Sequence, residues 1–187
     1  MFIGHLAVAL AAKRVRPSAP ISALIAATYG PDVIEVTLLA LWQWARMPAS
    51  FGSHSIPAVA LGAAVVGVAY WLWRRDAVGS ALLTATYASH WVADLFTGTR
   101  KPTWAGGPSL GLELYDHPPI DFALESALFL AAWLFLWPAG DRRRRRRAVR
   151  LALPIALLLL QGAFNSARRL FGISSLKGAV TATQGDG

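Results

Sequence analysis

Two ionisable residues, His90 and Asp94, lie four residues apart in the otherwise apolar stretch YASHWVADLF. On a helix this spacing places both side chains on one face, with about 5 to 6 Å between their Cβ atoms. An imidazole and a carboxylate in this arrangement can bind a divalent metal or move a proton. Hydrogen bonding between helices is the structural alternative for the same pair.

Other candidate ligands lie near the ends of neighbouring apolar segments. Asp32 and Glu35 have an i, i+3 spacing in YGPDVIEV, so a helix would place them on one face. His54, in FGSHSIP, precedes a second apolar segment. His54 is therefore either a ligand or a histidine at the water interface, beside a helix cap formed by serine.

A further group begins the apolar segment at 120–137, in YDHPPIDFALES. His117, Asp121 and Glu125 follow one another at intervals of four and can share a helix face. The alternatives are a solvated loop histidine at His117 and first-turn acids, favoured by the helix dipole, at Asp116 and Asp121. Glu125 lies one turn deeper, where that explanation does not apply. His5 joins these residues only if its short N-terminal segment enters the same bundle.

The composition indicates an integral membrane protein. Of 187 residues, 55% are hydrophobic and 15% are charged, and the mean hydropathy is +0.44. A charged side chain at the bilayer centre costs at least about 2.5 to 3.5 kcal/mol, so ionisable residues there are usually tied to function or to a partner. The chain has no cysteine, which excludes disulfides, thiolate ligands and cysteine nucleophiles and leaves the redox compartment open.

The apolar segments predict an all-α fold, a polytopic transmembrane helical bundle in one domain at 1–170, with a disordered polar tail at 171–187. A short N-terminal segment, 2–12, cannot span at 1.5 Å per residue. Its apolar run precedes the basic KRVR, the reverse of a secretory signal, so we expect it to be retained. Gly30 and Pro31 predict a break in the first long helix, because proline lacks the backbone donor. The five predicted spanning helices are 21–45, 56–73, 78–96, 120–137 and 149–164.

Much of the net charge of +8 comes from one arginine run, DRRRRRRAVR. Clustered arginines can bind nucleic acid, but a run between two apolar segments is typical of a topology determinant that meets anionic head groups. We therefore expect membrane lipids, and no nucleic acid, as partners. With a cytoplasmic N-terminus and five spans, the histidines lie on the non-cytoplasmic side. The basic residues then on the cytoplasmic side are Lys13, Arg14, Arg16, Arg74, Arg75, Arg142 to Arg147 and Arg150.

Together these motifs resemble the YdjM-like membrane-bound metal-dependent hydrolase family of the bacterial inner membrane. The resemblance covers residues 1–137 and is carried by MFIGHLAVALAAKRV, the aspartate of PDVIEV, SHS, SHWVADL, GLELYDHP and ALESALFL. It implies a helical membrane protein that binds a divalent metal, with zinc as the expected ion, in an arrangement likened to zinc-dependent phospholipase C. The ligands it implies are His5, Asp32, His54, His90 and Asp94, with Glu125 as a further acidic member. The chain departs from the family pattern at FTGTRKPTW, where a histidine-containing loop is expected, and at YDHPP, where a small polar pair is commoner.

Histidine and carboxylate ligands without thiolate suit zinc or manganese. We predict His54, His90 and Asp94 as the first ligands and Asp32 as a fourth or bridging ligand. Such a metal lowers the pKa of bound water toward about 7.

Glu125 or Glu35 is the expected general base. A site near the non-cytoplasmic head groups favours hydrolysis of a phosphoester or ester bond in a lipid-like or phosphorylated substrate. Arg100 and Lys101 either hold a phosphate or are solvated loop charges.

Two other functions fit the same residues. The His/Asp cluster could serve a non-enzymatic membrane transporter or ion-binding protein. The chain could also be a degenerate family member that forms bundle contacts and binds no metal.

Overall fold

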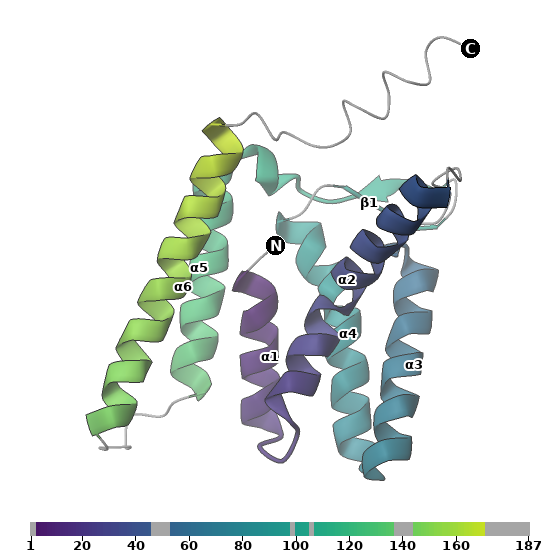
Figure 1. Ribbon diagram of the computed structural model, residues 1–187, viewed down its shortest axis with the longest axis horizontal. Coiled ribbons are helices and arrows are strands. Elements are labelled where there is room, and N and C mark those ends of the chain that lie inside the picture. The colour runs from purple at the N-terminus through teal and green to yellow at the C-terminus, as the bar shows by residue number, and fades with distance from the viewer. Residues whose placement is uncertain (1–2, 46–52, 98–99, 105–106, 137–143, 171–187) are drawn as a thin grey trace.

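The computed structural model describes residues 3–45, 53–97, 100–104, 107–136 and 144–170. These residues form six α-helices, a two-stranded hairpin and one turn of 3-10 helix (Figure 1). The predicted helical fold is therefore confirmed, whereas the tail predicted at 171–187 lies outside the described residues. The elements are α1 (Ile3–Val15), α2 (Ile21–Ala45), α3 (Ile56–Arg74), α4 (Ala77–Thr97), β1 (Lys101–Pro102), β2 (Ser109–Leu110), η1 (Leu114–Asp116), α5 (Pro118–Leu136) and α6 (Arg144–Leu170).

Not all of these helices could cross a membrane by themselves. The apolar part of α6 is short, and α4 interrupts its apolar sequence with His90, Asp94 and several hydroxyl residues. A bundle of five spans therefore stays a prediction. The described helices that are long and apolar enough to cross are three: Ile21–Leu41 within α2, Ile56–Arg74 and Pro118–Leu136.

Helix α2 runs without interruption through Gly30 and Pro31, so the predicted break in this helix is wrong. Within a helix, proline removes one N–H donor, the one that would bond the carbonyl four residues earlier. Pro31 is buried, and α2 packs against α4 and α1. Tertiary packing of this kind supplies most of the stability of a helix in a protein and outweighs the local preference of the proline.

Close packing of three helices centres on Tyr87, whose side chain is buried. A Cβ atom on Gly30 of α2 would lie 2.6 Å from Tyr87 Cε2, and one on Gly62 of α3 would lie 2.3 Å from the Tyr87 hydroxyl oxygen. The two glycines therefore let α2 and α3 approach α4 closely. Since His90 follows Tyr87 by three residues, on the same face of α4, this packing also fixes the position of His90.

Helix α1 lies in the middle of the bundle, with α5 on one side and α2 and α4 on the other (Figure 1). Its 13 residues reach about 20 Å at 1.5 Å per residue, less than the thickness of a bilayer core. The short N-terminal segment is thus a central element of the fold. The apolar cluster that joins it to α5 contains Ile3, Ala7, Leu10, Phe129, Ala132 and Trp133.

The two ends of the bundle differ in their polar residues. At the end where α1 and α3 finish, Arg16 Nη2 lies 3.1 Å from Asp76 Oδ1, and α6 begins at this same end (Figure 1). The opposite end carries the β1–β2 hairpin. Thr103 O accepts a hydrogen bond from Ile56 N at the start of α3 (2.9 Å). The hairpin is therefore tied to the beginning of α3.

Candidate metal centre

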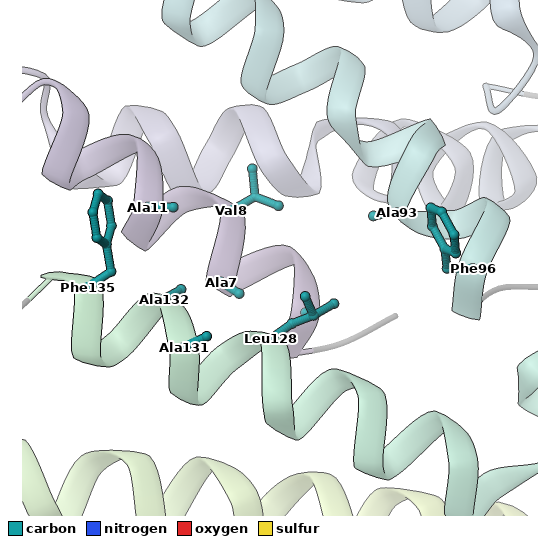
Figure 2. A pocket seen from close by; sticks show the side chains of 10 residues that line it. Ala7, Val8, Ala11, Ala93, Phe96, Leu128, Ala131, Ala132 and Phe135 are labelled. Atoms are coloured by element: carbon teal, nitrogen blue, oxygen red, sulfur yellow. The ribbon is translucent and has the colours of Figure 1, made fainter.

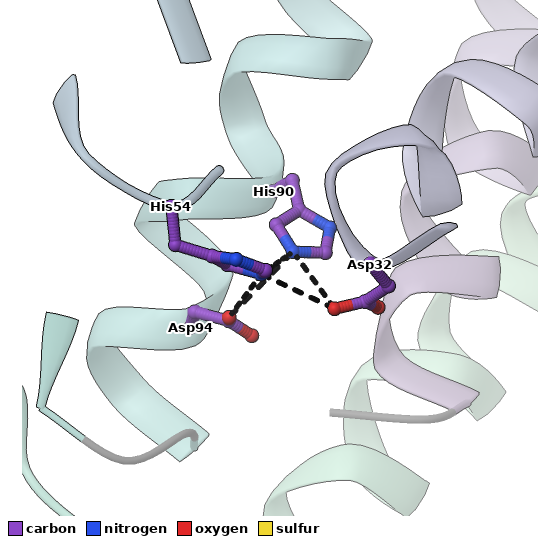
Figure 3. Close-up of side chains that lie close together, drawn as sticks. All are labelled: Asp32, His54, His90 and Asp94. Carbon is purple, nitrogen blue, oxygen red and sulfur yellow. Dashed lines mark hydrogen bonds and ion pairs between the residues drawn. The ribbon is translucent and has the colours of Figure 1, made fainter. Parts of the chain in front are cut away.

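Four side chains from three parts of the chain converge near the hairpin end of the bundle (Figure 3). Asp32 comes from α2, His54 from the segment before α3, and His90 and Asp94 from α4. One potential ligand atom of each residue lies within 4.8 Å of the other three. The two Nε2 atoms are 3.0 Å apart, and each lies 3.2 to 3.6 Å from Asp32 Oδ1 and Asp94 Oδ2. Four of the five predicted ligands therefore face one common centre.

The second ring nitrogen of each histidine is bonded away from this centre. His90 Nδ1 lies 2.8 Å from the carbonyl oxygen of Thr28, which can only accept, so Nδ1 carries the proton. His54 Nδ1 likewise donates to the Glu35 carboxylate. With the proton on Nδ1, each Nε2 faces the centre and can offer its lone pair to a metal ion.

The local sequence accounts for the placement of His54. Asp32 and Glu35, one turn apart on α2, bond the two different nitrogens of this ring. Ser53 Oγ lies 3.0 Å from Pro31 O, which holds the segment against α2. Ser55 accepts the Ala58 N–H at 3.4 Å and caps α3. In the motif SHS, the serines fix the chain and the histidine between them reaches the centre.

The convergence brings four possible electron-pair donors close together, with the Lys101 ammonium 3.1 Å from one of them, Asp94 Oδ2. Two Nε2 lone pairs and two carboxylate oxygens repel one another unless a cation lies among them. Burial alone would lower the pKa of His54, but hydrogen bonds to Asp32 and Glu35 raise this pKa above its ordinary value. A group of ligands that attracts a proton in this way also attracts a metal ion, which competes for the same lone pairs.

The centre is enclosed unevenly. The side chains of His54, His90 and Asp94 are at most 4% exposed, whereas that of Asp32 is 43% exposed. Burial of an ionised side chain without a partner is unfavourable, and water does not reach these three enclosed side chains to solvate them. The open side of the centre is therefore the side of Asp32.

His5, the fifth predicted ligand, lies beside the other four. It is fully buried, with Nε2 3.7 Å from Asp94 Oδ1 and its ring centroid 4.0 Å from that of His90. Asp94 thus presents Oδ2 to the common centre and Oδ1 to His5. His5 is at the edge of the centre and does not belong to the group of four.

The two predicted general bases occupy different places. Glu35 bonds the His54 nitrogen that faces away from the centre. Glu125 is fully buried, and its Oε2 accepts the backbone N–H groups of Ile3 (3.0 Å) and Gly4 (3.3 Å). These are donors that a helix N-terminus leaves without intrahelical partners. The contacts give Glu35 a part in orienting His54 and Glu125 a part in anchoring α1, while a role as general base stays a prediction for both.

The remaining residues near the start of α5 do not join the group of four described above. His117 and Asp116 are exposed, and Asp121 is buried. The backbone carbonyl of His117 accepts the N–H groups of Ile120 and Asp121, at 2.9 and 3.1 Å, as α5 begins. For His117, the structure shows the solvated histidine of the alternative interpretation.

An apolar cavity of about 390 Å³ lies between α1, α4 and α5 (Figure 2). Ala93 contributes to its wall and directly precedes the candidate ligand Asp94, and Gly4 directly precedes His5, which lies at the edge of the centre. The sequence analysis missed this cavity, because alanines at helical spacing are also typical of plain helix packing. Its lining residues are Gly4, Ala7, Val8, Ala11, Ala93, Phe96, Leu128, Ala131, Ala132 and Phe135.

Comparisons of the chain with protein-family models, with curated proteins and with solved structures gave no match. The YdjM-like resemblance therefore stays a prediction from the sequence motifs.

Proposed function

We propose that this chain is a membrane-embedded hydrolase that depends on a divalent metal held by Asp32, His54, His90 and Asp94. One observation carries the proposal: two imidazole Nε2 atoms and two carboxylate oxygens face a common centre, with both Nδ1 atoms bonded elsewhere. A network built only for hydrogen bonding would pair donors with acceptors. This arrangement instead leaves four electron-pair donors for one cation.

Zinc is the metal that fits the spacing best. Tetrahedral zinc with ligands at 2.0 to 2.1 Å has ligand atoms about 3.3 Å apart. The five distances that link the four ligand atoms through a histidine nitrogen run from 3.0 to 3.6 Å. Zinc with nitrogen and oxygen ligands lowers the pKa of a bound water toward about 7, which supplies a nucleophile at neutral pH.

The reaction is hydrolysis of a phosphoester or ester bond. Asp32 is the exposed ligand, so water and substrate reach the centre on its side. Glu35 keeps the His54 ring in the tautomer that ligation needs, and the Thr28 carbonyl does the same for His90.

A lipid-like substrate in the bacterial inner membrane is favoured by two features. The described chain has three helices able to cross a membrane, and the apolar cavity beside the centre can accept hydrocarbon. If five helices span the membrane and the N-terminus is cytoplasmic, the basic end of the bundle faces the cytoplasm and the metal centre lies near the opposite face.

Metal content tests the proposal without requiring a substrate. The protein is purified in detergent as wild type, His90→Ala and His117→Ala, loaded with zinc, dialysed and measured by elemental analysis. We expect stoichiometric zinc in wild type and in His117→Ala, whose histidine is exposed and outside the centre, and loss of zinc from His90→Ala. Zinc retained by His90→Ala, or absent from wild type, would contradict the site.

Turnover separates the enzyme from its alternative. The zinc-loaded protein is assayed against phosphoesters and carboxylic esters, in water-soluble and lipid forms. Hydrolysis that disappears in His90→Ala supports the hydrolase. Stoichiometric metal without turnover on any of these substrates favours the ion-binding or transport function instead.

A further inference from the structure

Lys101 brings a positive charge directly to the candidate metal centre. Its Nζ lies 3.1 Å from Asp94 Oδ2, the same oxygen that faces the Nε2 atoms of His54 and His90. The Lys101 side chain is 16% exposed, so the contact is largely enclosed.

The backbone around Lys101 is held from several sides. Lys101 pairs with Leu110 in the β1–β2 hairpin, and Thr103 N donates to Pro108 O at 3.1 Å. Thr103 O in turn accepts the N–H of Ile56, two residues after His54. The hairpin that carries Lys101 is therefore attached to the segment that carries a metal ligand.

The neighbouring residue, Arg100, has a different environment. Its side chain is 57% exposed, and its Nε lies 3.4 Å from Glu113 Oε2. The two adjacent cations therefore have different environments. Arg100 lies at the surface of the loop, and Lys101 contacts the centre.

A lysine in this position would share Asp94 Oδ2 with a bound metal ion, so a further anion can stabilise both cations. A metal ion bound by Asp94 Oδ2 would lie within a few ångströms of the Lys101 ammonium, and two positive charges at this range repel. A phosphate group resolves the conflict, since one oxygen can bind the metal while another accepts a hydrogen bond from the ammonium. A carboxylic ester carries no charge in its ground state and would leave the repulsion in place.

We infer that Lys101 binds a phosphate oxygen of the substrate beside the metal, so that the bond hydrolysed is a phosphoester. This inference rests on the proposed function and selects one of its two substrate classes. In the reaction, water supplies an oxygen to phosphorus, the phosphorus–oxygen bond to the alcohol breaks, and the alcohol leaves with a proton from the water. No oxidant or reductant is required.

The test is phosphate binding to the full chain in detergent, loaded with zinc. Inorganic phosphate is titrated by calorimetry into wild type, Lys101→Gln, Lys101→Arg and Arg100→Gln. Loss of a charge-assisted hydrogen bond predicts about 10- to 100-fold weaker phosphate binding in Lys101→Gln. Arg100→Gln removes the same charge one residue away, at an exposed position, and should change the affinity by less than about twofold. Lys101→Arg keeps the charge and should retain most of the affinity.

Zinc content measured in parallel separates the outcomes. Equal phosphate affinity in zinc-loaded wild type and Lys101→Gln overturns the role of Lys101 and leaves the metal site standing. Loss of zinc from Lys101→Gln also overturns it, because removal of a cation beside the centre should strengthen metal binding. Absence of zinc from wild type overturns the proposed function itself.

Turnover identifies the source of the phosphate group. Zinc-loaded wild type and Lys101→Gln are assayed with p-nitrophenyl phosphate, with phosphatidic acid in mixed micelles and with p-nitrophenyl acetate. A loss in Lys101→Gln on either phosphate substrate, with acetate hydrolysis unchanged, supports the inference. Loss on the micellar substrate alone assigns the site to lipid head groups. Equal losses on phosphate and acetate contradict selection of a phosphoester.

Discussion

At the end of the bundle where α1 and α3 finish, Arg16 and Asp76 form an ion pair whose side chains are 39% and 21% exposed. At the other end, His54, His90 and Asp94 have side chains that are at most 4% exposed and face one another without a matched set of donors. Water can solvate each partner of the first pair separately, so that pair contributes little to stability. The second group has little such solvation, so a neighbouring cation, whether the Lys101 ammonium at Asp94 Oδ2 or a bound metal ion, stabilises it. The comparison shows that the number of ionisable residues indicates a functional site poorly. How far their side chains are buried from water is a better indication.

The largest effect that would test this comparison is expected from Glu35→Gln. Glutamine can still accept a hydrogen bond from His54 Nδ1, but it lacks the negative charge that raises the basicity of the ligating ring. Loss of such a partner typically weakens metal binding by about 10- to 100-fold. Zinc affinity is measured by competition with a chelator, with Glu113→Gln, an acid in the loop beyond the hairpin, as the charge-matched control. Zinc affinity equal to that of wild type would show that the ring needs no such support.

Gly62→Ala should have an intermediate effect, on stability. The new methyl group would lie 2.3 Å from the Tyr87 hydroxyl oxygen, so the buried Tyr87 ring or the helices around it must shift. Overpacking of this kind destabilises a protein by about 1 to 3 kcal/mol. Gly162→Ala is the control, because its added Cβ would meet its nearest neighbour, Phe122 Cε2, at an ordinary 3.7 Å. The midpoints of thermal unfolding in detergent are compared; equal midpoints for the two variants would show that α3 yields to the methyl group.

The smallest effect on stability is expected at the end of the bundle that carries the Arg16–Asp76 ion pair. Arg16→Gln removes one partner of an exposed pair and should shift the unfolding midpoint less than Gly62→Ala does. Asp76→Ala should shift it more than Arg16→Gln, because Asp76 Oδ1 also accepts the Gly79 N–H (3.0 Å) at the start of α4. A larger shift for Arg16→Gln would mean that the ion pair, and not the helix cap, is the stabilising contact.

We expect the contribution of Asp76 to stability to depend on pH. The hydrogen bond from Gly79 and the nearby Arg16 hold the pKa of Asp76 below its ordinary value. A carboxyl group with a lowered pKa stabilises the fold fully above its unfolded pKa, about 3.9, and loses that contribution as the pH falls through the folded pKa. The difference in unfolding midpoint between wild type and Asp76→Ala should therefore shrink when the pH is lowered from 7 toward 3. A constant difference would exclude the carboxylate charge as its cause.

The positions of the helices could be predicted from the sequence because each apolar segment carries its own signal. Residues 21–45 coincide with α2, and the i, i+4 spacing of His90 and Asp94 identified one face of α4 correctly. The predicted break at Pro31 was wrong, because the helix preferences of single residues do not include the energy of packing against other helices. The contacts that keep α2 helical come from α1 and α4.

The parts of the site that escaped prediction depend on contacts between distant residues or on the backbone. The Thr28 carbonyl fixes the tautomer of His90. Every residue has a backbone carbonyl, so the sequence does not indicate which one accepts this hydrogen bond. Arg100 and Lys101 are neighbours with the same charge, so the same two interpretations applied to both before their contacts were known. The pairing of Lys101 with Leu110 directs successive side chains to opposite sides, and this distinguishes them.

The anchoring of α1 has a consequence for how the protein is made. The amide groups of Ile3 and Gly4 bond to Glu125, which follows them in the chain by more than a hundred residues. During synthesis α1 therefore emerges long before its anchor exists, and it is too short to hold a transbilayer position alone. The contact between α1 and Glu125 therefore forms only after α5 has been made, and so does the final placement of His5 at the edge of the candidate metal centre.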